Sequence, residues 1–313
     1  METLDTNDAN SIGLVGTGRM GRAIGLRLIK LGHHLVVWNR TASNAETLVS
    51  AGATLASTCQ ELIGRCQTAL IIVRDSEAMK EVYFARQGIL SSPIEGRAIV
   101  EMTTATVDAV KHAGAAVLDA GGIFVDAPVS GSLEPARMGQ LVIMAGGRQS
   151  HVAFVSPILE KLSRKLIHAG PLGSGIVLKL VLNLLLACYW QALGEALALG
   201  RSHGLQLDAM LSLILDSKAA IGALPFKTSR ILGTEATVEF DLAGMHKDLL
   251  CMQQSAEDGD LVLPATAAAA QSAGEAVERG WGGKDLAQLV RFVADQVNHD
   301  QSVKQVAQAK TAL

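Results

Sequence analysis

A lysine and an asparagine stand four residues apart inside a long apolar stretch. Lys179 and Asn183 occur in the run I-V-L-K-L-V-L-N, and a helix places residues at this spacing on one face. Burying an ammonium group is costly unless it is paired or its pKa falls, so this lysine requires an explanation. Proton donation and acceptance by Lys179 would supply one. The alternative is that Lys179 extends to solvent near the start of the helix while Asn183 caps a neighbouring backbone.

A glycine-rich turn follows the first expected strand, at 12–15, and opens a helix that we expect to end near Leu31. The turn has the pattern GxGxxG and consists of Gly16, Thr17, Gly18, Arg19, Met20 and Gly21. Its glycines permit a tight turn and a close backbone approach to a pyrophosphate, which then sits at the helix N-terminus. The next expected strand, at 35–38, falls at the required distance. The segment therefore predicts dinucleotide binding rather than a purely structural turn.

The residues after that second strand indicate which nicotinamide cofactor binds. A site for NAD places Asp or Glu here to accept from the ribose hydroxyls, whereas this chain has Asn39, Arg40 and Thr41. A guanidinium can make paired hydrogen bonds to a 2′-phosphate, which an acidic side chain would repel. The triplet therefore favours NADP(H). The alternative is that Arg40 is a solvated loop residue.

A second turn rich in small residues also follows an expected strand. It consists of Asp126, Ala127, Pro128, Val129, Ser130, Gly131 and Ser132. Such a turn can offer backbone N–H groups and a hydroxyl group to a substrate carboxylate. Turns rich in serine and glycine also occur without a binding role, so this segment carries little weight by itself.

Short apolar strands alternate with helices in the first half of the chain, which predicts an α/β fold with a doubly wound, mostly parallel Rossmann sheet at 11–170. We expect strands at 12–15, 35–38, 69–73, 98–102, 124–127 and 141–145. An all-helical domain is expected at 171–300, after a Gly/Pro-rich stretch. Its first helix, at 176–201, is apolar almost all round and is expected to be a buried, long interdomain helix. Further helices are expected at 207–217, 243–258, 265–280 and 286–297, with loose ends at 1–10 and 301–313.

Composition excludes several classes of function. The 27 lysine and arginine residues against 30 aspartate and glutamate residues give a net charge of −3, so no general basic field exists to hold nucleic acid. The longest charge-free run, 180–194, is too short and polar for a membrane span, and 1–10 has no apolar signal segment, so we expect a cytoplasmic protein. The cysteines form no CxxC pair and the histidines match no metal-binding spacing, so neither disulfides nor a metal is expected.

Together these segments resemble the β-hydroxyacid dehydrogenase family, which includes 3-hydroxyisobutyrate dehydrogenase, tartronate semialdehyde reductase and glyoxylate/succinic semialdehyde reductase. The matching motifs are the turn at 16–21, the segment 126–131 with Gly139, Gly146 and Gly147, the run G-x-G-x-x-x-K-x-x-x-N at 173–183, and Lys247-Asp248-Leu249. They span nearly the whole chain in the family's order. The segments 39–41 and 130–132 are most similar to the NADPH-dependent glyoxylate/succinic semialdehyde reductase branch.

The resemblance implies a role for each matching residue. Lys179 is the catalytic acid/base that protonates the carbonyl oxygen, and Asn183 orients this lysine or helps to hold the substrate. The substrate-binding residues are Ser130, Gly131, Ser132, Phe240 and Asp248. The remaining cofactor residues are Val73, Arg74, Thr104 and Lys247. For Phe240 and Asp248 the alternative is a core phenylalanine and a solvated helix residue.

The expected activity is NADPH-dependent reduction of a short carbonyl acid, such as glyoxylate or succinic semialdehyde, to the hydroxy acid. One alternative is an NAD(P)-dependent 3-hydroxyacid dehydrogenase of the 3-hydroxyisobutyrate or tartronate semialdehyde type. Another is an imine reductase, because such enzymes resemble this fold and share the W-N-R-T segment but lack the lysine. A binding module without chemistry is disfavoured because Lys179 is present. The apolar helical domain predicts a homodimer or homotetramer, and no nucleic-acid or membrane partner is expected.

Overall fold

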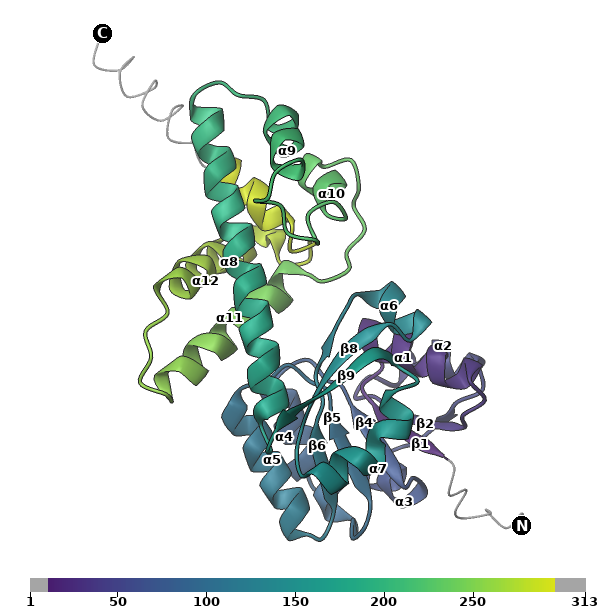
Figure 1. Ribbon diagram of the computed structural model, residues 1–313. Coiled ribbons are helices and arrows are strands. Elements are labelled where there is room, and N and C mark those ends of the chain that lie inside the picture. The colour runs from purple at the N-terminus through teal and green to yellow at the C-terminus, as the bar shows by residue number, and fades with distance from the viewer. Residues whose placement is uncertain (1–10, 296–313) are drawn as a thin grey trace. The chain divides into compact units, whose positions relative to one another are not determined.

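The computed structural model describes residues 11–295, which form a nine-stranded sheet with helices, followed by a helical part (Figure 1). The chain divides into two compact units, one up to Val181 and one from Leu182, and the division falls within a single long helix. The expected fold class, a Rossmann α/β unit followed by helices, is confirmed. The expected loose ends at 1–10 and 301–313 lie outside the described residues.

The sheet is built around six parallel strands in the order β3-β2-β1-β4-β5-β6. Their bounds are β1 Ile12–Val15, β2 Leu35–Trp38, β3 Thr54–Leu55, β4 Thr68–Ile71, β5 Ala98–Glu101 and β6 Ile123–Asp126. β1, β4 and β5 are buried at every position, which explains their nearly continuous apolar sequences. The strand order reverses at β1, which pairs with β2 on one side and β4 on the other. Open α/β sheets bind ligands at the carboxyl ends of the strands at such a point.

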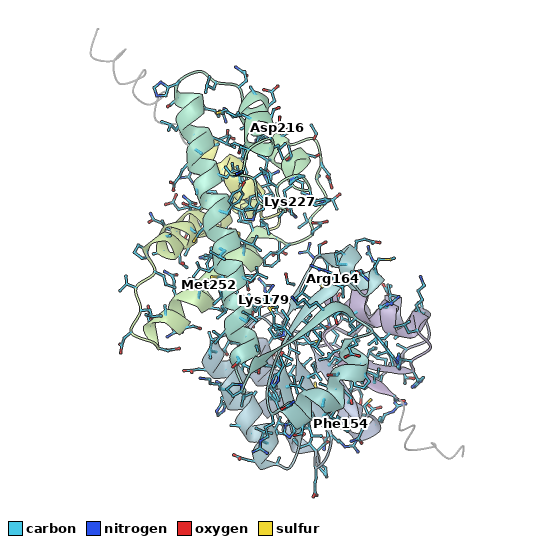
Figure 2. All side chains as sticks on the ribbon, viewed as in Figure 1. Phe154, Arg164, Lys179, Asp216, Lys227 and Met252 are labelled. Atoms are coloured by element: carbon cyan, nitrogen blue, oxygen red, sulfur yellow. The ribbon has the colours of Figure 1, made fainter. Side chains whose placement is uncertain are left out.

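Three further strands complete the sheet. β8 (Leu141–Gly146) pairs antiparallel with β6 and with β7 (Val129–Ser130), and β9 (Ser163–Gly170) pairs parallel with β8. The sequence patterns predicted β8 but missed β3, β7 and β9. Two of these have only two residues, too few to show a period. β9 exposes Arg164 (labelled in Figure 2) and Lys165, as expected of an edge strand, and therefore lacks an apolar run.

The helices of the first unit connect the strands of the sheet. Their bounds are α1 Arg19–Lys30, α2 Glu46–Ser50, α3 Cys59–Arg65, α4 Ser76–Phe84, α5 Val107–Asp119, α6 Leu133–Met138 and α7 Gln149–Leu159, with 3₁₀ turns at Ala42–Ala45 and Ile89–Ser91. Side chains cap three of them: Thr58, Asp75 and Thr106 accept hydrogen bonds from the first turns of α3, α4 and α5. No side chain caps α1. Its N-cap residue is Gly18, which has no side chain to accept from the first turn.

Helices form the rest of the described chain, from α8, which begins in the first unit, to the end of the second unit. Their bounds are α8 Ser174–Ser202, α9 Leu207–Leu215, α10 Thr228–Leu232, α11 Leu242–Glu257 and α12 Pro264–Ala276, with a π turn at Val277–Trp281 and a last helix over 288–295. The prediction missed α10, which has only five residues. The expected helix at 265–280 is α-helical only to Ala276 and then continues as the π turn, in which Gly280 has a non-helical φ of 83°.

The expectation that α8 is buried all round is wrong for the single chain. Val177, Val181, Leu185 and Leu199 are 44%, 53%, 64% and 65% exposed, and they follow one face of the helix. Only 33% of its most apolar window is buried. Among the described residues α8 is the one helix whose length and composition would allow it to cross a membrane. That is weak evidence, because core helices of soluble proteins share both properties.

A buried network of ion pairs holds the segment between α10 and α11. Lys227 (Figure 2) lies with its Nζ 2.9 Å from Asp285 Oδ2 and 3.0 Å from Glu239 Oε2. Arg230 adds ion pairs to Glu235 and Glu239. Lys227 and Asp285 are both almost fully buried. Each would be a costly buried charge if the other were removed.

We therefore expect Lys227→Met to lower the free energy of unfolding by about 3–5 kcal/mol, because it leaves the Asp285 carboxylate without its cation. Denaturant unfolding followed by far-UV circular dichroism measures this change. Lys218→Met is the matched control, since Lys218 lies in the same unit on an exposed position. Equal midpoints for the two variants would contradict a stabilising role for the network.

Candidate active site

The glycine-rich turn between β1 and α1 leaves backbone N–H groups available to an anion. Gly16 has a φ of 93°, a conformation that favours glycine. A side chain at Gly21 would collide with the Gly16 carbonyl oxygen, so the first turn of α1 packs directly on the loop. A Cβ on Gly18, at the start of α1, would meet no atom within 4 Å. These features fit a pyrophosphate at the N-terminus of α1.

The end of β2 is tied to this turn by the side-chain amide of Asn39. Its Oδ1 accepts from the Thr17 N–H at 3.0 Å, and its Nδ2 donates to the Thr41 carbonyl oxygen at 2.9 Å. Thr17 is fully buried, and its hydroxyl has no hydrogen-bond partner within the described part of the chain. A buried hydroxyl without a partner requires an explanation, and a ligand bound in the turn would supply one. Asn39 thus fixes the relative position of two predicted cofactor segments.

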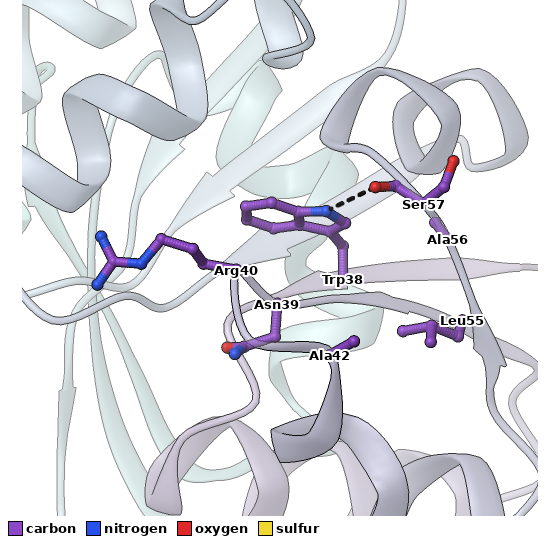
Figure 3. A pocket seen from close by; sticks show the side chains of 7 residues that line it. All are labelled: Trp38, Asn39, Arg40, Ala42, Leu55, Ala56 and Ser57. Atoms are coloured by element: carbon purple, nitrogen blue, oxygen red, sulfur yellow. Dashed lines mark hydrogen bonds between the residues drawn. The ribbon is translucent and has the colours of Figure 1, made fainter.

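A shallow hollow of about 330 Å³ lies beside the end of β2 (Figure 3). Its lining residues are Trp38, Asn39, Arg40, Ala42, Leu55, Ala56 and Ser57. The Trp38 indole donates to the Ser57 carbonyl oxygen at 3.3 Å, which fixes the ring. Arg40 is exposed, and its Nη1 lies 3.1 Å from Glu81 Oε2. Such an exposed ion pair is weak, so the guanidinium can turn to a stronger anion.

Two loops at the carboxyl edge of the sheet are joined by a buried chain of hydrogen bonds. Val73 N–H, after β4, donates to Thr103 Oγ1 at 3.0 Å. Thr103 N–H, after β5, donates to Glu101 Oε1 at 2.8 Å. The predicted cofactor residues Val73 and Thr104 thereby belong to loops that are held together. Arg74, by contrast, is exposed, with its Nε 3.9 Å from Asp75 Oδ2.

Sequence reasoning missed Glu101 and Thr103. The signal was present in the run A-I-V-E-M at 98–102, where an acidic residue interrupts an otherwise apolar strand. Burial raises the pKa of Glu101 to about 7, against hydrogen bonds from Thr103 and Tyr83 that lower it. The pKa of this buried carboxyl group therefore lies above that of an ordinary surface acid.

The turn after β6 anchors the long helix α8 to the sheet. Asp126 is fully buried, and its two carboxylate oxygens accept from the N–H groups of Gly173 and Ile176, each at 2.8 Å. Burial raises the pKa of Asp126, although these backbone hydrogen bonds lower it. Side chains at Gly146 or Gly175 would collide with this carboxylate. The small residues of these predicted motifs are thus required by packing around Asp126.

The predicted substrate turn, Ser130 to Ser132, continues directly from β7. Ser130 ends that strand and is half-buried. Gly131 has a φ of 134° and packs against Leu141, so the position requires glycine. Ser132 precedes α6 but makes no side-chain capping bond to it.

The predicted catalytic lysine lies in the second turn of α8, in the first unit (Figure 2). Lys179 is half-buried, on the helix whose first residues Asp126 holds. Asn183 follows one helical turn later and belongs to the second unit. The two side chains therefore share one face of α8, as the sequence spacing predicted.

The second unit brings Asn183 together with α11. Asn183 Nδ2 donates to Asp248 Oδ2 at 2.8 Å, and Lys247 Nζ lies 2.7 Å from Asp248 Oδ1. Asp248 is almost fully buried, so the alternative of a solvated helix residue is wrong. Phe240 is 37% exposed, which also excludes a core phenylalanine. The Asp241 carboxylate caps α11 by accepting from the Gly244 N–H at 2.8 Å.

Two family models together match nearly all of the described chain. Residues 11–170 match the NAD-binding domain of 6-phosphogluconate dehydrogenase. Residues 173–293 match the model described as NAD-binding of NADP-dependent 3-hydroxyisobutyrate dehydrogenase. Both descriptions support a nicotinamide cofactor. In the described part of the chain no group of three or more His, Cys, Asp or Glu side chains is arranged to hold a metal ion.

Individual proteins are also similar to this chain over most of its length. Glyoxylate/succinic semialdehyde reductase 1 of Arabidopsis thaliana is 30% identical over 90% of this chain and 98% of its own length. The human cytokine-like nuclear factor N-PAC is 29% identical over 76% of this chain, which corresponds to only 43% of that protein. The structure of Mycobacterium tuberculosis 3-hydroxyisobutyrate dehydrogenase with L-serine has a TM-score of 0.81 at 22% identity, covering 91% of this chain and 99% of that one.

We expect Asn39→Ala to weaken NADP⁺ binding about tenfold, because it removes the hydrogen bond that fixes the glycine-rich turn at Thr17 to the end of β2 and the one that holds the backbone at Thr41. Isothermal titration calorimetry measures the change. Asn44→Ala is the control, since Asn44 is exposed in the same loop. Unchanged affinity in Asn39→Ala would show that the turn is positioned without this amide.

Proposed function

Because this chain belongs to the β-hydroxyacid dehydrogenase family of NAD(P)-dependent oxidoreductases, we propose that it is a reductase that uses NADPH to convert a short carbonyl acid to the hydroxy acid. Glyoxylate, succinic semialdehyde and related semialdehydes are the proposed substrates. The observation that carries the proposal is the position of Lys179 on a helix that Asp126 fixes to the carboxyl edge of the sheet. The glycine-rich turn opens at the same edge.

The proposed chemistry needs a proton donor at a fixed place. A bound nicotinamide cofactor supplies the hydride that the carbonyl carbon receives. The ammonium group of Lys179 donates a proton to the carbonyl oxygen, which prevents a full alkoxide from accumulating. In the reverse direction, the neutral amine takes that proton from the hydroxyl group. Solvent restores the lysine to its starting state after each turnover.

Other residues receive supporting roles in the proposal. Asn183, one turn further along α8, orients the lysine or holds the substrate, and its own amide is fixed by Asp248. Ser130, Gly131 and Ser132 bind the substrate carboxylate through the hydroxyl and N–H groups of their turn. Phe240 and Asp248 are the proposed substrate contacts from the helical unit, and Lys247 is the proposed cofactor contact.

The preference for NADPH rests on the residues after β2. Asn39, Arg40 and Thr41 include no acidic side chain that would repel a 2′-phosphate. Arg40 borders the hollow at this strand end and can exchange its exposed Glu81 partner for the phosphate. Val73, Arg74 and Thr104 are assigned to the opposite, nicotinamide end of the cofactor.

The alternative function within the family is an NAD(P)-dependent 3-hydroxyacid dehydrogenase, which the description of the second family model favours. It uses the same lysine in the oxidising direction. Imine reduction is less favoured because Lys179 is present. We also place the protein in the cytoplasm.

The exposed apolar row on α8 supports a homo-oligomer. Val177, Val181 and Leu185 would otherwise expose apolar side chains to water on one face of α8, with Leu199 further along the same face beyond the exposed Glu195. We propose that a second copy of the chain covers this row, in a homodimer or homotetramer. Sedimentation of the purified chain tests this proposal.

We expect Lys179→Met to lower kcat for NADPH-dependent glyoxylate reduction by a factor of about 10² to 10⁴, because the carbonyl oxygen loses its proton donor. Stopped-flow and steady-state absorbance at the reduced cofactor's band measure this rate. The affinity for NADPH is expected to stay within about twofold, since the change removes no assigned cofactor contact. Lys165→Met, on the exposed edge strand, is the matched control. A Lys179→Met variant that turns over like the natural chain would eliminate the proposed acid/base role.

A further inference from the structure

A carboxylate at the centre of the sheet has no part in the proposed chemistry. Glu101 is the last residue of β5, is 1% exposed, and lies in register with Ile71 on β4 and Asp126 on β6. Two acids, Glu101 and Asp126, are thus neighbours at the carboxyl edge. Burying a carboxylate is costly unless its oxygens receive hydrogen bonds. A purely apolar residue would suit the strand better, so Glu101 requires its own explanation.

Both oxygens of Glu101 are used by groups from different elements. Tyr83, on α4, is fully buried and donates its hydroxyl to Oε2 at 2.9 Å. The Thr103 N–H, in the loop after β5, donates to Oε1 at 2.8 Å. The carboxylate therefore joins α4 to the loop after β5. Phe124 packs beside the Tyr83 ring, with the ring centres 6.3 Å apart.

Thr103 extends this connection to the loop after β4. Its side chain is buried, and its Oγ1 accepts from the Val73 N–H at 3.0 Å. A second link lies further along both loops, where the Thr106 N–H donates to Ser76 Oγ at 3.1 Å. Thr104 lies between the two links. Glu101 and Thr103 consequently determine where the backbone at Val73 and Thr104 sits.

We propose that Glu101 is a positioning residue that, through Thr103, holds the Val73 and Thr104 loops against the nicotinamide end of the cofactor. This inference rests on the proposed function, which assigns those two residues to the cofactor. Because Glu101 is 1% exposed, we assign it no contact with substrate or cofactor; it acts by fixing the backbone of the two loops. Small displacements of a bound hydride donor reduce the rate of transfer strongly, so such a residue affects turnover more than affinity.

The experiment separates positioning from general stability. Glu101→Leu removes both acceptors, and Thr103→Val removes the hydroxyl group that accepts from the Val73 N–H and that also forms a side-chain hydrogen bond with Glu101. Glu101→Gln and Thr103→Ser are the conservative partners, because an amide can accept from Thr103 while donating to Tyr83, and serine keeps the hydroxyl group. For each variant we would measure kcat at saturating NADPH and glyoxylate, and the affinity for 2′-phospho-ADP-ribose, which lacks the nicotinamide ring.

We expect kcat to fall about tenfold or more in Glu101→Leu and Thr103→Val, while affinity for 2′-phospho-ADP-ribose changes less than about twofold. The conservative variants should keep kcat within about threefold. The double variant Glu101→Leu/Thr103→Val should be no slower than the slower single variant, because both changes break one chain of bonds. If Glu101→Leu fails to fold, the kcat and the 2′-phospho-ADP-ribose affinity of Thr103→Val alone test the proposal.

Two results would overturn the proposal. One is a folded Thr103→Val variant with the kcat of the natural chain. The other is a parallel loss of kcat and of 2′-phospho-ADP-ribose affinity, which would indicate damage to the whole nucleotide-binding unit. Failure of the proposed function is distinguishable, because the natural chain itself would then fail to reduce glyoxylate with NADPH.

The pH dependence of stability gives an independent check that the carboxyl group is buried. Burial raises the pKa of Glu101 from 4.5 to about 7. The folded chain therefore holds this proton more tightly than the unfolded chain, and the resulting stability is lost as the pH rises from 4.5 through 7. Tyr83, with Cys59 beside it, and Asp126 face the same group. Glu101→Gln should remove this part of the pH dependence, and an identical dependence in both proteins would contradict it.

Discussion

The hydrogen bonds from Gly173 and Ile176 to the buried Asp126 carboxylate connect the edge of the sheet proposed to bind the cofactor with the helix that carries the proposed proton donor, Lys179. Asp126 is the last residue of β6, at the edge of the sheet where the glycine-rich turn opens. The N–H groups that donate to its carboxylate lie at the start of α8. Because a helix is rigid over one turn, fixing its first residues also fixes Lys179. The glycines at 146 and 175 follow from the same constraint, since only they leave room for the carboxylate.

Much of the fold could be predicted because the parallel strands are buried on both faces. Their apolar runs and the GxGxxG turn indicated the Rossmann unit, and helical periodicity indicated most later helices. β7 and β9 were missed because one is too short and the other is an exposed edge strand. The spacing of Lys179 and Asn183 correctly predicted a shared helix face, but no local pattern shows that Asp248, 65 residues later, binds that asparagine.

Burial was the least predictable property. The sequence of α8 suggested a helix enclosed on all sides, yet one row of its apolar residues is exposed in the single chain. An apolar sequence shows that a helix face avoids water, but it does not show whether the same chain or another copy covers that face. Glu101 shows the converse, because an acidic residue that composition counts as surface charge is buried and bonded at the sheet edge.

The most direct measurement is the initial rate of NADPH and NADH oxidation, side by side, with glyoxylate, succinic semialdehyde and a cyclic imine. We predict rapid oxidation of NADPH, and slow oxidation of NADH, with glyoxylate or the semialdehyde. Such a result would support both the role of the residues after β2 in NADPH binding and the role of Lys179 on α8 in carbonyl reduction. A preference for NADH would contradict the role of Arg40, and turnover of the imine alone would contradict carbonyl chemistry at Lys179.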